Sequence, residues 1–81
     1  MTKLRNIGPV SRQWLYEIEI YTLADLQQCG SITAYEMIRS QHPKVSINLL
    51  WALEGAILDL DWRELSAEQK AMLRSQLTEA Y

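Results

Sequence analysis

The segment SINLLWALEGAILDL, residues 46–60, constrains the fold of this chain more than any other, because it is apolar almost all around a helical wheel. Its only strongly polar residues before Asp59 are Asn48 and Glu54. A helix with apolar residues on every side belongs inside a protein, since any surface position would leave some of them in water. We therefore predict a helix over residues 47–60 at the centre of the domain, with the other elements wrapped around it.

Glu54 places an acid on this apolar helix, within the stretch WALEGA. A buried carboxylate needs a charged or hydrogen-bonding partner. We predict that Glu54 is mostly buried and has a structural role, bonded to a basic side chain or to backbone N–H groups. Arg5 and Arg12 are the candidate bases, and either would tie the first helices to the central one.

Capping signals divide the rest of the chain into short helices. Gly8 and Pro9 end any helix that begins at Lys3, and Pro9 then starts the next helix because its fixed φ suits a first helical position. A capping-box pattern occurs twice, at Thr22 with Asp25 and at Ser66 with Gln69, and Gly30 supplies a stop signal between the two. Ser31 is a further cap signal, and Pro43 is a further break signal.

No segment alternates polar and apolar residues over the length of a strand. We therefore predict an all-α fold, a compact domain of five to six short helices with an N-terminal helix, turn and helix. The chain has 81 residues, which suits one domain over residues 1–81.

The same sequence predicts a cytoplasmic protein. Cys29 is the only cysteine, so the chain forms no intramolecular disulfide and fits a reducing compartment. The N-terminal stretch MTKLRNIGP lacks the apolar region of a signal peptide. No apolar run approaches the about 18 residues that a membrane-spanning helix needs. We predict no membrane partner.

No residue set in the sequence carries an enzymatic or metal-binding pattern. His42 is the only histidine and precedes Pro43 in a polar connection, where a loop role outweighs a catalytic one. One cysteine and one histidine do not make a zinc set, and Asp59 with Asp61 lacks the pattern of a calcium loop. We predict no catalytic residues, no metal, no cofactor and no enzymatic activity.

Charge is unevenly distributed along the chain. The net charge of −2 argues against the broad basic surface of a strong nucleic-acid binder. However, Lys3, Arg5 and Arg12 all precede the first acid, Glu17. The positive charge is thus centred on the turn at Gly8, although three bases on a small domain also fit an ordinary solvated surface.

The segment LRNIGPVSRQWLYEIEIYTLADL, together with VSINLLWALEGAI and the tryptophan that follows, resembles the C-terminal domain of the TfoX/Sxy family. Members of this family regulate bacterial DNA uptake and competence genes. The resemblance runs from Lys3 to about Leu73, most of the chain. It implies a non-enzymatic bacterial module of transcription regulation, which either stands alone or is one domain of a longer protein.

The first part of this segment also resembles the helix-hairpin-helix class, through its Ile-Gly-Pro turn and the later Ile-x-Thr-Leu-x-Asp-Leu. That class often binds DNA phosphates through hairpin amides without reading sequence, because N–H groups at a turn and a helix N-terminus form an anion site. Asn6 stands where such hairpins usually have a second glycine. Glu19 stands where the class often has glycine, and we predict strain at the end of that helix.

The resemblance implies weak contacts with the DNA backbone, made by the amides of Gly8, Val10, Ser11 and Arg12 and by the basic side chains of Lys3, Arg5 and Arg12. The candidate DNA-binding residues are Lys3, Arg5, Asn6, Gly8, Val10, Ser11 and Arg12.

A second function stays open, in which the turn is only scaffolding and the domain binds another protein or a second copy of itself. Trp62 lies among the charged residues Asp61, Arg63 and Glu64 and is the tryptophan best placed for such a contact. The candidate protein-interaction residues are Trp62, Met72 and Tyr81.

Overall fold

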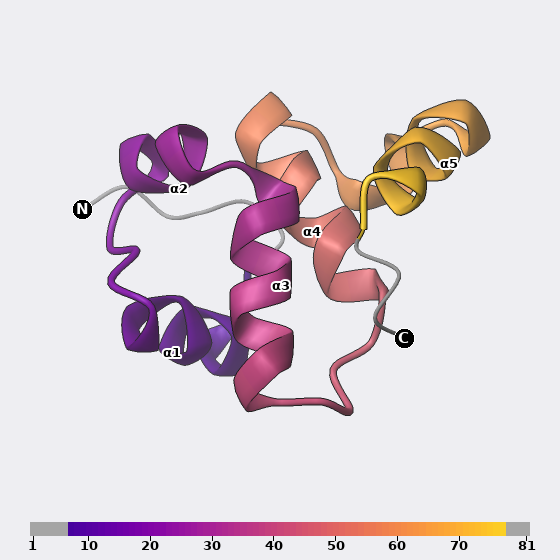
Figure 1. Cartoon of the computed structure of the whole chain (residues 1–81). Helices are drawn as coiled ribbons and strands as arrows, with labels where there is room; N and C mark the ends of the chain where they lie inside the picture. Colours follow the sequence, from indigo (N-terminus) through magenta and orange to yellow (C-terminus); the bar gives the residue numbers. More distant parts are fainter. Residues whose placement is uncertain (1–6, 78–81) are drawn as a thin grey trace.

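The computed structural model describes residues 7–77, and these form helices joined by short connections (Figure 1). No strand occurs in this part of the chain, so the predicted all-α fold is confirmed. In chain order the elements are α1 (Pro9–Glu17), α2 (Leu23–Cys29), α3 (Ser31–Gln41), α4 (Asn48–Leu58), the 3₁₀ turn η1 (Trp62–Glu64) and α5 (Ala67–Ser75).

Helix α4 is the central element, as its apolar sequence predicts. It packs against α2, α3 and η1, and in Figure 1 it lies between α3 and α5. The side chains of Leu50 and Leu53 are fully buried. The helix ends at Leu58, two residues earlier than predicted, because Asp59 adopts a left-handed conformation with φ of 59° and the N–H of Leu60 turns back to the carbonyl of Gly55 at 2.8 Å.

Glu54 is held by a partner that the sequence analysis did not identify. Its Oε1 accepts a hydrogen bond of 2.7 Å from the Ser31 hydroxyl, and the carboxylate is only partly buried. The predicted pairing with Arg12 is wrong, and Arg5 lies outside the described residues. Ser31 is also not the cap of α3: Gly30 occupies that position, so Ser31 is the first helical residue and lies buried.

The predicted capping boxes at the starts of α2 and α5 are both present. At α2, Thr22 Oγ1 accepts from the N–H of Asp25, and the Asp25 carboxylate accepts from the backbone N–H groups of Tyr21 and Thr22. The bond from Tyr21 is the main reason that the pKa of Asp25 lies below its ordinary value of 3.8. The carboxylate therefore stabilises α2 above that pH, and this contribution is lost as the pH falls through the lowered pKa.

Glu19 adopts the left-handed conformation after α1, with φ of 64°. The chain closes the helix there in a Schellman arrangement: the N–H of Ile20 bonds to the carbonyl of Leu15 at 2.9 Å, and the N–H of Glu19 bonds to that of Tyr16 at 3.0 Å. Glycine is the usual residue at this position because a side chain costs energy when φ is positive. The predicted strain at Glu19 is therefore present.

Replacing this residue is expected to stabilise the protein. Glu19→Gly removes the unfavourable side chain from a left-handed position and should raise the free energy of unfolding by about 1 kcal/mol. For a domain of this size the melting temperature should rise by about 4 to 8 °C. Calorimetry measures the effect. Glu19→Ala is the control, since it removes the same charge but keeps a β-carbon, and an equal gain in both variants would contradict the explanation.

No helix within residues 7–77 is long and apolar enough to cross a membrane.

Candidate functional site

The turn that begins α1 has an exposed and uncovered backbone. Gly8 is the N-cap of α1, Pro9 follows it, and no side chain within the described part of the chain caps the helix. The first turn of α1 contains no acidic residue. No hydrogen bond joins the amides of Val10 or Ser11 to another described residue, so both can donate to an anion outside the chain.

Gly8 is not required by the packing of the described residues. Its backbone is extended, with φ of −84° and ψ of −179°, which any residue can adopt. A β-carbon added there would meet nothing within 4 Å. The missing side chain therefore leaves open the space in front of the turn.

The structure removes one donor from the predicted set. The N–H of Arg12 forms the first bond of α1, to the carbonyl of Gly8 at 2.9 Å, so the prediction that this amide faces an anion is wrong. The Arg12 side chain remains beside the turn, where it lines an open hollow with Gly8 and Tyr16. Three other residues of the predicted set, Lys3, Arg5 and Asn6, lie outside the described residues.

The other side of α1 brings the two predicted surfaces together. Ser11, from the predicted DNA-binding set, and Trp62, from the predicted interaction set, line one hollow between α1 and α4. The spacing of the two residues along the chain gives no sign of this proximity, which comes from the packing of segments far apart in the sequence.

The predicted interaction residues are placed on the C-terminal part of the fold. Trp62 is partly buried in η1, and Met72 of α5 is 62% exposed. Tyr81 lies outside the described residues. A basic residue that was not predicted links the tryptophans of this region: Lys70 Nζ lies 5.7 Å from the ring centroid of Trp62 and 5.8 Å from that of Trp51.

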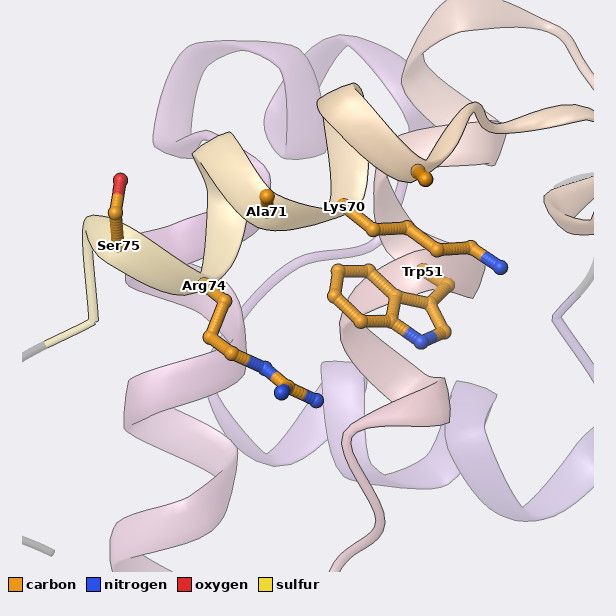
Figure 2. A pocket seen from close by; sticks show the side chains of 6 residues that line it. Trp51, Lys70, Ala71, Arg74 and Ser75 are labelled. Atoms are coloured by element: carbon orange, nitrogen blue, oxygen red, sulfur yellow. The ribbon is translucent and has the colours of Figure 1, made fainter.

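A third hollow, of about 530 Å³, opens between α4 and α5. Figure 2 shows the Trp51 indole flanked by the side chains of Lys70 and Arg74, with the small residue Ala71 above it. The residues that line it are Trp51, Ala67, Lys70, Ala71, Arg74 and Ser75. Sequence analysis missed the two bases, although their spacing of four residues on one helix is a signal that they share a face.

The chemically reactive side chains are engaged in structural contacts. His42 Nε2 lies 3.0 Å from Glu17 Oε1, and its ring packs on Trp14 at 4.8 Å between centroids, which joins α3 to α1. Partial burial raises the pKa of the Cys29 thiol and so disfavours the reactive thiolate. Within residues 7–77 no three histidine, cysteine or acidic side chains gather as metal ligands would.

Asp61, one of the two acids compared above with a calcium loop, is bonded to a neighbouring base. Its carboxylate accepts two hydrogen bonds from the Arg63 guanidinium, at 2.9 and 3.0 Å. This bond and the charge of Asp61 raise the pKa of Arg63. Asp61 also caps η1 by accepting from the Arg63 N–H at 2.9 Å.

Comparison with known proteins agrees with this architecture. Two crystal structures of Listeria monocytogenes proteins are similar to the chain, one described as an uncharacterized protein in a triclinic form and the other as a protein of unknown function in a tetragonal form. Both are 35% identical and cover 89% of this chain; the first match covers 82% of its own chain with a TM-score of 0.84, and the second 88% with a TM-score of 0.83. No curated protein matches the sequence.

The sequence model of the TfoX C-terminal domain matches residues 1–77, which is nearly the whole length of the 81-residue chain. This agrees with the resemblance in the segments around the Gly8 turn and along the central helix. The chain therefore belongs to the TfoX C-terminal domain family.

Proposed function

We propose that this chain is a non-enzymatic regulatory module of the TfoX type that acts in the control of bacterial competence and DNA uptake. The family match over residues 1–77 supports this role. The contacts of His42, Glu17 and Asp61 between or within helices support a structural role for these side chains, which fits a binding module.

The module acts through a weak contact between the Gly8 turn and the DNA backbone. The observation that carries this proposal is the open backbone at Gly8, where neither φ nor packing among the described residues calls for glycine. A phosphate can approach the turn closely and accept from the amides of Val10 and Ser11 at the positive end of α1. Arg12 adds a positive charge beside it, and such contacts do not distinguish one base sequence from another.

DNA affinity is the test of this proposal. If Lys3, Arg5 and Arg12 neutralise two to three phosphates, log K should fall against log salt with a slope of roughly −2 to −3. The dissociation constant should be on the order of 10⁻⁴ to 10⁻⁶ M at physiological salt, with little sequence preference. The double variant Arg5→Glu with Arg12→Glu should lose binding. Fluorescence anisotropy with a labelled duplex, titrated at several salt concentrations, measures these values.

Lys44→Glu is the matched control for the charge changes. Lys44 is exposed in the turn after α3, so its reversal changes the net charge by the same amount as Arg12→Glu alone, at a residue that is not part of the Gly8 turn. Circular dichroism establishes that each variant keeps its helices. The proposal is wrong if the wild-type domain fails to bind at low salt, where screening is weakest, or if Lys44→Glu weakens binding as much as Arg12→Glu.

A protein-interaction module is the second candidate function, and the surface around α5 favours it. Met72 is 62% exposed, so it presents apolar surface that a partner can cover. Trp62 is partly exposed, and the Lys70 ammonium lies over its ring. In this version the Gly8 turn is scaffolding and the contact surface comprises Trp62, Met72 and Tyr81.

A further inference from the structure

The hollow between α4 and α5 combines an apolar floor with two positive charges. The floor is the edge of Trp51 with the small side chains of Ala67 and Ala71, which leave room for a side chain from outside. Lys70 and Arg74 stand one helical turn apart on α5 and flank the indole (Figure 2). Among residues 7–77, no acidic side chain lines the hollow.

These two charges are not neutralised by acids of the described residues. Lys70 packs over the rings of Trp51 and Trp62, and neither it nor Arg74 forms an ion pair within residues 7–77. This is notable because the chain carries ten acidic side chains against eight basic ones. Pairing with a ligand outside the chain would satisfy both cations.

The burial of the indole argues against nucleic acid as this ligand. Trp51 is only 5% exposed, and the Lys70 ammonium lies near its face, so no open ring is available for a base to stack on. An apolar side chain, by contrast, fits the seat above Ala71 beside the indole edge. Carboxylates on either side of such a side chain would reach Lys70 and Arg74.

We propose that the hollow formed by Trp51, Ala67, Lys70, Ala71, Arg74 and Ser75 binds an acidic segment of another protein, with one apolar side chain seated on Ala71 and flanking carboxylates bonded to Lys70 and Arg74. This inference deepens the second candidate function, because it names the chemistry of the partner. It does not depend on the contact between the Gly8 turn and DNA.

Peptide binding tests this site directly. The probe is a short fluorescein-labelled peptide in which pairs of Glu alternate with single Leu, and anisotropy reports its binding to the full chain. Lys70→Glu and Arg74→Glu should each weaken binding by about tenfold, since each loses a charge-assisted hydrogen bond. Ala71→Trp should weaken it similarly by filling the seat without a change of charge. Ala71 is exposed, so the fold accommodates the larger residue.

The controls separate this site from simple electrostatic attraction and from DNA binding. Lys44→Glu changes the same charge outside the hollow and should leave the peptide affinity unchanged. The same peptide with each Leu changed to Ser should bind about tenfold more weakly, because burial of one apolar side chain is lost. Arg12→Glu should reduce affinity for duplex DNA and leave that for the peptide unchanged.

Three results would overturn the proposal. The first is a wild-type domain that does not bind the Leu-containing peptide. The second is equal binding of the Leu and Ser peptides, which would indicate that charge alone attracts the peptide and that no apolar side chain binds at Ala71. The third is a loss of DNA affinity in Lys70→Glu with no change in peptide affinity, which would assign the surface to nucleic acid. Loss of DNA binding in Arg12→Glu alone bears only on the Gly8 turn.

Discussion

Leu53→Ala is expected to lower the free energy of unfolding by about 3 to 5 kcal/mol, because a fully buried leucine side chain leaves a cavity that rigid neighbours fill only in part. Leu53 has no exposed surface and lies on α4, which contacts α2, α3 and η1. A chain of 81 residues has a total stability of roughly 4 to 12 kcal/mol, so this single change removes a large share of it. Urea unfolding followed by circular dichroism measures the loss.

Leu58→Ala provides a control on the same helix. Leu58 is the last residue of α4 and is 43% exposed, so the same substitution removes less buried surface and leaves no closed cavity. Its cost should be below about 1 kcal/mol. Equal costs at the two positions would contradict the central place of α4, because a central helix buries Leu53 in the core and leaves Leu58 exposed at its end.

The helices were predictable from local signals that act within a few residues. The capping boxes at Thr22 and Ser66, the proline at the start of α1 and the all-round apolar α4 each depend on their own neighbours. The left-handed position at Glu19 was also expected, from the place where a glycine is usual. Such signals can be recognised in the sequence because capping hydrogen bonds join residues within one helical turn of each other.

Contacts between helices were not predictable in the same way. Ser31 resembles a cap in sequence, but the one-residue connection at Gly30 starts α3 earlier and places the Ser31 hydroxyl against Glu54. The position of Lys70 between two tryptophans depends on where α5 packs, which no local pattern encodes. The candidate DNA turn was therefore found from sequence, whereas the hollow on α5 emerged only from the structure.

Gly30→Ala is expected to destabilise the protein through the backbone and not through packing. Gly30 ends α2 and caps α3, with φ of 88° and ψ of 151°, a region of backbone space that is essentially reserved for glycine. A β-carbon there meets nothing within 4 Å, so the cost is conformational strain of about 1 to 3 kcal/mol. If the chain relaxes instead, the bond between Ser31 and Glu54 is the contact that breaks. Thermal unfolding measures the loss of stability.

Gly8→Ala is the matched control, because its added β-carbon also meets open space but its φ is −84°. The cost should be about 1 kcal/mol or less, the preference for glycine over alanine at an N-cap.

The two variants also separate folding from function. Gly8→Ala should keep its fold but bind DNA more weakly, since a methyl group then stands in front of the turn. Gly30→Ala should bind DNA normally per folded molecule. Unchanged DNA affinity in Gly8→Ala would contradict close approach of a phosphate to this turn, and equal losses of stability in both variants would contradict the strain at Gly30.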